Sequence, residues 1–265
     1  MTQAYQDLLE AALAPTRINV GPAVGATPRG VAPAEAAYQR ALIVWNRALV
    51  RMVVRELRPV LATATDAPRR DADIDVNKLL EALANIRRRL PELAARALPS
   101  INRALERLNR DNLRDVRRVL PISIADQGPE VAGTLANWRT ENVRLVTTIG
   151  PRLLDDLQDL LVTAATTGMR VETLRKRIQE RFSVSESRAK LIAVDQTLKG
   201  NSALTQARHR QAGVTSYIWT TSRDERVRPE HRALDRQEFR WDDPPPPGHP
   251  GQDFNCRCVA RPVIR

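Results

Sequence analysis

Most of the chain repeats apolar residues with the period of an α-helix. Between residues 34 and 64 apolar side chains recur at spacings of three and four, which places them on one stripe of a helix: Ala41, Trp45, Ala48, Leu49, Met52 and Val53. The aromatic content is only 4%, and Ala, Leu and Arg are abundant, which also favours helix. The pattern predicts a helical body of roughly 210 residues.

Proline, glycine and serine mark the expected helix boundaries. Pro59 is expected to kink or end the helix over 34–64, because proline lacks the N–H that the helix needs. By the same reasoning, Pro91, Pro99 and Pro121 divide residues 75–120 into two or three helices. Further helices are expected over 129–150, 151–168, 171–182 and 186–212. The first two of these end at Gly150 and Gly168, and the last is expected to begin after an N-cap at Ser185 and to end at Gly213.

The last fifth of the chain changes from helical periodicity to β-branched and aromatic residues. Residues 214–221 (VTSYIWTT) predict a strand, and 237–241 and 258–264 predict two further short strands. A small second core is expected from Trp219, Phe239, Trp241 and Phe254. The predicted fold class is therefore mainly α, a helical body with a small α+β C-terminal module of short strands.

Three regions follow from these patterns. Residues 1–33 are an N-terminal segment, including a short helix over 1–15, and a flexible arm rich in Gly and Pro. Residues 34–130 are a helical region without an assignable motif. Residues 131–265 form a domain with helices over 131–212 and a β-containing module over 213–265.

The net charge of the chain does not by itself decide between classes of function. The formal net charge is +11, carried almost entirely by 38 Arg against 4 Lys, and it is spread evenly along the chain. Such a surface favours binding near nucleic acid or another polyanion, and it is equally typical of a protein that uses Arg as its ordinary surface residue.

No apolar run approaches the ~18 residues of a membrane span, and the N-terminus lacks the basic start of a secretory signal. Two cysteines cannot form a disulfide framework, which indicates a chain made in the cytosol.

The C-terminal module holds both cysteines and two of the three histidines of the chain. His231, His249, Cys256 and Cys258 offer the thiolates and imidazoles that a tetrahedral Zn²⁺ site uses. A small module with few core residues also gains much from a metal ion. The alternative is a pair of buried thiols with two loop histidines. A disulfide in so tight a ring would be strained. The third histidine, His209, stands between two arginines and is expected to be exposed.

Acidic residues surround these candidate ligands. Asp224 or Glu230 could act as a general base beside a metal, which would make the chain a hydrolase. The same carboxylates fit a network of salt bridges that supports a loop-rich module, and no nucleophile, base and orienting group occur together. We therefore favour the structural role, with no catalytic residue and no enzymatic activity.

Several motifs of the C-terminal half occur together. They are LIAVDQT (191–197), Tyr217 and Trp219 with Thr221, DERVRPEHRALD (224–235), FRWDDPP (239–245) and PGQDFNCRC (250–258). In these motifs, over about residues 130–265, the chain resembles the phage head morphogenesis family, the minor head proteins similar to protein F of phage Mu. Residues 1–130 carry no motif of that kind.

The resemblance implies a set of metal ligands. Many relatives have a Cys pair near the RVRPEH segment, and here Arg228 stands where one Cys can occur and His231 where the second can. His231, Cys256 and Cys258 are then the expected ligands of one structural Zn²⁺, and the fourth is left open between His249 and Asp224. Arg236 replaces a glycine that is common after the Leu-Asp pair, so the turn there is expected to differ.

The resemblance also implies a role in a virion. Such proteins are few-copy head proteins that associate with the portal protein and capsid proteins during procapsid assembly, close to packaged DNA. The expected location is the head interior or the portal vertex of the virion, after synthesis in the host cytoplasm, as part of a multi-subunit assembly and away from membranes. The other functions considered are a metal-dependent hydrolase or toxin-like effector, and a DNA-binding protein of the virion.

Overall fold

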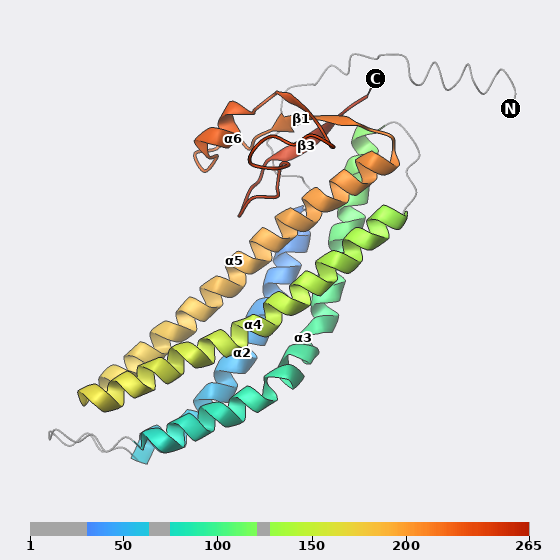
Figure 1. Ribbon diagram of the computed structural model, residues 1–265. Helices are drawn as coiled ribbons and strands as arrows, with labels where there is room; N and C mark the ends of the chain where they lie inside the picture. Colours follow the sequence, from blue (N-terminus) through green and yellow to red (C-terminus); the bar gives the residue numbers. More distant parts are fainter. Residues whose placement is uncertain (1–30, 64–74, 121–127, 265) are drawn as a thin grey trace, which may run out of the picture. The chain divides into compact units, whose positions relative to one another are not determined.

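A computed structural model describes residues 31–63, 75–120 and 128–264, and four long helices make up most of them (Figure 1). The helices are α2 (Val31–Thr63), α3 (Val76–Val119), α4 (Pro129–Thr167) and α5 (Val171–Gln211). The expected helix over 1–15 and most of the expected arm lie outside the described residues. The prediction of a mainly helical fold with a small β-containing C-terminal module is confirmed. Among the described residues, every helix is too short or too polar to cross a bilayer.

The helices run through several residues that were expected to end them. Pro59 lies inside α2, and Pro91 and Pro99 lie inside α3, so the two or three helices expected over 75–120 are one. The end expected at Gly150 was also wrong, because α4 continues through Gly150 and Pro151. A proline in a helix interior costs about 3 kcal/mol, since it removes a hydrogen bond and crowds the preceding turn.

Packing outweighs this local penalty in α3. Buried apolar side chains continue along the helix on both sides of its prolines: Ile86, Leu90, Leu93, Ala94, Ala97 and Ile101. A break in the helix at either proline would interrupt that buried stripe and expose part of it to water. The helix therefore continues to Val119.

Residues 171–211 also form one helix instead of the two expected. Ser185 does not cap a new helix, because its hydroxyl donates a hydrogen bond to Asn46 Oδ1 at 2.6 Å across the helix interface. The predicted ends at Gly168 and Gly213 are confirmed. Both glycines have positive φ, 62° and 74°, which closes the helix with a hydrogen bond back to its last turn.

The chain divides into two compact units, and each long helix contributes to both. The second unit contains residues 36–105 and 139–194. Its buried apolar side chains include Leu42, Trp45, Leu49, Val53, Leu79, Leu83, Ile86, Leu153, Leu157 and Leu161. Polar contacts join its helices: Tyr38 donates to Asn142, and Arg87 pairs with Asp155 at 2.7 Å.

The first unit contains described residues 31–35, 106–120, 128–138 and 195–264. One of its apolar clusters joins Ala34, Leu108, Val131, Leu204 and Ala207. A polar layer lies between α3 and α5, where the fully buried Arg208 guanidinium donates to the side-chain oxygens of Asn112 and Asn109. Asn112 donates in turn to Asn201 Oδ1 at 2.9 Å. Because a buried cation is costly without such acceptors, this layer favours one register of α3 against α5.

The C-terminal module of the first unit contains the three predicted strands. They are β1 (Ser216–Thr220), β2 (Glu238–Arg240) and β3 (Val259–Val263), and the short helix α6 (Pro229–Ala233) lies between β1 and β2 in the sequence. The sheet order is β2-β1-β3, and both outer strands are antiparallel to β1. Figure 1 shows α6, β1 and β3 beside the C-terminal part of α5.

The module has its own core, as predicted, with two differences. Tyr217, Trp219 and Trp241 are buried together with both cysteines, and Phe239 packs against them. Phe254 is 53% exposed, so its assignment to this core was wrong. The expected exposure of His209 was also wrong: the side chain is 1% exposed, its ring packs edge-on against Trp241, and burial lowers its pKa to about 4.

Two helix glycines provide a matched test of packing in the first unit. A Cβ on Gly200 would collide with the indole of Trp138 and lie 3.0 Å from Leu108 Cδ2, whereas a Cβ on Gly133 would meet nothing within 4 Å. We expect Gly200→Ala to lower the free energy of unfolding by about 1–3 kcal/mol. Gly133→Ala should raise it by about 0.5–1 kcal/mol, because alanine restricts the unfolded chain. Urea denaturation of both variants measures the difference, and equal effects would contradict the close approach at Gly200.

Candidate metal centre

Three of the predicted ligands come together in the module. Cys256 Sγ lies 3.5 Å and Cys258 Sγ 3.7 Å from Nδ1 of His231, and the three ligand atoms are all within 4.8 Å of one another. All three side chains are buried, and both cysteines are free thiols. The structure therefore brings two sulfurs and one imidazole nitrogen to one point inside the protein.

Helix α6 positions His231. The helix starts with Pro229 at its first turn, where the missing N–H of proline costs nothing. The guanidinium of Arg228, the residue before it, donates to Phe254 O at 2.8 Å and pairs with Asp253 at 3.0 Å. These contacts hold the start of α6 against the loop that carries the cysteines.

Helix α5 positions that cysteine loop. The buried Asp195 accepts a hydrogen bond from the backbone N–H of Asn255 at 2.9 Å, and Lys199 pairs with its other oxygen at 2.8 Å. Asn255 has a φ of 51°, so the chain turns sharply just before Cys256. Ser202, further along α5, donates to the carbonyl of Pro250. The loop is thereby tied to the helix at both of its ends.

Gly251 completes the loop. Its N–H points at Cys256 Sγ, with 3.4 Å between the two atoms, and its φ is 84°. A Cβ at this position would lie 2.8 Å from Ser202 Cβ. Both the conformation and the close approach to α5 therefore require glycine here.

The two thiols differ in their acidity. A hydrogen bond from Cys258 is the main cause that lowers the pKa of Cys256, against the opposing effect of burial. The same hydrogen bond and burial raise the pKa of Cys258. On the other side of the imidazole, Nε2 of His231 is buried and lies 3.5 Å from Asp253 Oδ2. A carboxylate in that place orients a histidine whose other nitrogen binds a metal.

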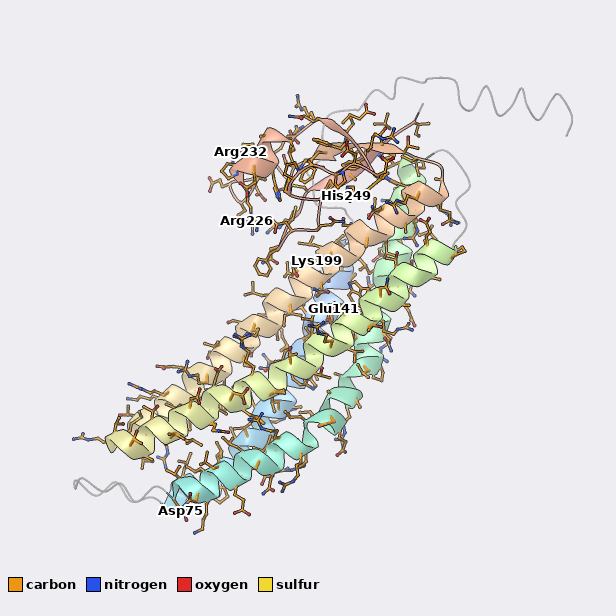
Figure 2. The ribbon with its side chains drawn as sticks, viewed as in Figure 1. Asp75, Glu141, Lys199, Arg226, Arg232 and His249 are labelled. Atoms are coloured by element: carbon orange, nitrogen blue, oxygen red, sulfur yellow. The ribbon has the colours of Figure 1, made fainter. Side chains whose placement is uncertain are left out.

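The remaining candidate ligands lie elsewhere. His249 Nδ1 is 2.9 Å from the hydroxyl of Tyr217, and its ring packs against Trp241. Asp224 pairs with Arg257 at 3.3 Å and accepts the N–H of Arg226 at 3.0 Å. Among the described residues, neither belongs to the group that could hold a metal. Figure 2 labels His249 close to α5, and Arg226 and Arg232 on the side of the module that carries α6.

The turn at Arg236 keeps the conformation that glycine would favour. Its φ is 68°, and its N–H donates to Trp219 O at 2.8 Å. The expectation of a different turn was therefore wrong. Neighbouring contacts hold it: Asp235 accepts hydrogen bonds from the N–H and hydroxyl of Thr221. Burial acts to raise the pKa of Asp235. The hydrogen bonds from Thr221 and the positive charges of Arg223 and Arg236 outweigh that effect, so the pKa is lowered.

Sequence reasoning missed three residues that build the centre: Asp195, Gly251 and Asp253. All three lie in the motifs LIAVDQT and PGQDFNCRC, in which the residue types pointed only to the cysteines as site residues. Asp195 precedes Asn255 by 60 residues, so spacing alone could not pair them. An acidic residue directly after the apolar run LIAV was the available sign, because a carboxylate among buried positions needs a partner.

The donor set fits zinc. Tetrahedral zinc with two sulfurs and one nitrogen places its ligand atoms about 3.3–3.8 Å apart, and the two measured sulfur–nitrogen distances are 3.5 and 3.7 Å. The buried Nε2 of His231 beside Asp253 also fits the usual partner of a metal-bound imidazole. These three side chains could therefore hold a metal ion.

We expect Asp195 to control the order of the cysteine loop. Asp195→Ala removes the acceptor of the Asn255 N–H and should lower the free energy of unfolding by about 1–3 kcal/mol. Asp195→Asn keeps an acceptor oxygen and should lose less. Amide exchange of Asn255 measures the hydrogen bond directly, and it should accelerate in the alanine variant only. Lys199→Met is the control, since it removes the ion pair and leaves the bond to Asn255; unchanged exchange in Asp195→Ala would refute the role.

Comparison with known proteins agrees with the motifs. The family described as "Phage Mu protein F like protein" matches residues 155–261, from the second half of α4 to β3, which confirms the resemblance over those residues. A Haemophilus influenzae relative described as "Uncharacterized protein" is 43% identical over 124 residues, which is 46% of this chain and 28% of the relative. The chain thus matches less than a third of that relative's length. No solved structure matches the chain.

Proposed function

Because residues 155–261 match the Phage Mu protein F like family, we propose that this chain is a structural head morphogenesis protein of a tailed phage or prophage. The match carries the proposal, since it includes the whole of α5, helix α6 and the cysteine loop. The architecture supports it: long helices and a small anchored module offer extended surfaces for contacts with other subunits. The proposed location is the virion, in the head interior or at the portal vertex.

The proposed partners are the portal protein and capsid proteins, with packaged DNA nearby. The net charge of +11 supports proximity to DNA, because arginines on the surface are attracted to phosphates. The charge is interleaved with acids, as in the pairs of Arg118 with Asp115 and Arg96 with Glu92. This arrangement favours a general attraction over sequence-specific DNA binding.

A structural role also fits the acidic residues of the module better than hydrolysis does. Asp224, one proposed general base, is held by Arg257 and Arg226. Asp253 faces His231 and Arg228. Carboxylates that are committed to arginine and histidine support the fold and are poorly placed to activate water.

The head-protein proposal predicts that the chain is part of the particle. Particles purified from the replicon that encodes the chain should contain it in a few copies, detectable by quantitative mass spectrometry against the major capsid protein. Deleting its gene should reduce infectious particles by at least about a hundredfold while the major capsid protein is still made. Absence from purified particles, or normal yields after deletion, would refute the proposal.

We further propose that His231, Cys256 and Cys258 hold one structural Zn²⁺. Bound there, the ion would join α6 to the cysteine loop and supply folding energy to a small module. The support is the convergence of three buried donors with the carboxylate of Asp253 beside the imidazole. The fourth ligand is left open, because His249 and Asp224 have other partners.

Zinc binding has a direct test. The purified full chain should contain about one zinc per molecule by elemental analysis, and a chelator should lower its melting temperature by about 10 °C or more. Cys256→Ser and Cys258→Ser should each lose the metal, because two remaining donors bind it weakly. Asp243→Asn changes an exposed carboxylate of the module that is outside this group of donors; it serves as the control and should keep the metal. The site would be excluded if the purified chain contains no zinc and its melting temperature changes with neither added zinc nor chelator.

A further inference from the structure

An open groove of about 430 Å³ lies in the first unit between the C-terminal parts of α3 and α5 and strand β3. Val116, Val119 and Leu198 contribute apolar side chains from the helices, and Val259 and Pro262 contribute from the strand. Val119 is 48% exposed although it is apolar and lies beside these residues. The groove therefore presents apolar surface that the described residues leave uncovered.

The groove follows the edge of β3. Residues 256–262 all line it without a gap, whereas a groove against one face of a strand would be lined by alternate residues. Strand β3 is the outer strand of the sheet, paired only with β1 among the described residues, and all five of its residues are half-buried. One edge of β3 therefore borders the groove.

The sheet register shows which backbone groups face that edge. Trp219 exchanges hydrogen bonds on the β2 side, donating to Gln237 O and accepting from Arg236 N–H. Because antiparallel strands alternate, Ile218 must direct its backbone groups to its partner in β3, Arg261. Ala260 then directs its N–H and C=O away from β1, to the open edge. Pro262 offers only its C=O there, since proline has no N–H.

Arginines border the groove. Arg118, Arg257 and Arg261 line it, and Asp115 is the one acidic residue that does so. Arg118 pairs with Asp115 at 3.4 Å and Arg257 pairs with Asp224 at 3.3 Å. Arg261 has no ion pair among the described residues. An occupant with a carboxylate near β3 would therefore meet an available positive charge.

From these features we propose that the groove binds an extended segment of another protein, with apolar side chains and at least one acidic residue. The segment would lie along β3 and exchange hydrogen bonds with Ala260, while its apolar side chains contact Val116, Val119 and Leu198. Strand addition of this kind takes affinity from backbone hydrogen bonds and selectivity from the side-chain contacts. The apolar lining favours a peptide over a nucleic acid, whose phosphates would not contact it. The inference is independent of the head-protein proposal.

The test uses the full chain and a fluorescein-labelled peptide of about seven residues, alternating valine and aspartate. Fluorescence anisotropy should show saturable binding, and a peptide of alternating valine and lysine should bind at least about tenfold more weakly. Ala260→Pro removes the N–H that faces the groove and no hydrogen bond to β1, and Arg261→Glu reverses the available charge. Each should weaken binding of the acidic peptide at least about tenfold. Ala260→Ser keeps the N–H and should bind within about twofold of the unaltered chain.

Amide exchange keeps the result interpretable if Ala260→Pro fails to fold. In the unaltered chain the amide of Ala260 should exchange rapidly and become protected by the acidic peptide, whereas that of Arg261 is already protected by β1. No saturable binding of the acidic peptide, or no added protection at Ala260, would overturn the proposal. Displacement of the peptide by duplex DNA, with Arg261→Glu weakening both, would instead identify a polyanion-binding surface and would also overturn it.

Discussion

The buried carboxylate of Asp195 holds the cysteine loop on helix α5, and the arrangement of the module depends on it. One oxygen accepts the N–H of Asn255 and the other pairs with Lys199, so the carboxylate has compensation for its burial. Asn255 stands directly before Cys256 in a left-handed turn. A displacement of this turn would move both sulfurs away from His231. A contact made by a helix thus sets the geometry of a centre built mostly from loops.

The module shows how a small unit becomes ordered without a large core. Its aromatic residues bury the cysteines on one side, and hydrogen bonds and ion pairs secure the loops on the other. Arginine has a large part in this: Arg228 binds the cysteine loop, and Arg210 of α5 donates to Trp241 O. Part of the basic character of the chain therefore serves its internal structure. The proposed zinc would add to contacts that already bring its ligands together.

The helical periodicity, the three strands and the glycine ends at Gly168 and Gly213 could all be predicted, because each depends on neighbouring residues. The breaks expected at Pro91 and Pro99 were wrong, because neighbouring residues alone do not decide whether a helix continues through a proline. A proline penalty is local, but the apolar stripe that outweighs it is buried by other helices. Ser185 is similar: its preference for a cap is local, and its hydrogen bond to Asn46 joins residues far apart in the chain.

The fold class, the position of the β-containing module, the positive charge and the set of side chains able to bind a metal all follow from the amino-acid sequence. Which of those side chains meet depends on the packing of the folded chain. Packing joined His231 to the two cysteines, placed His249 against Tyr217 and Trp241, and brought Asp195 and Asp253 to the centre. The difference is one of range: residue type and period act over a few positions, whereas a site is made by contacts between distant segments.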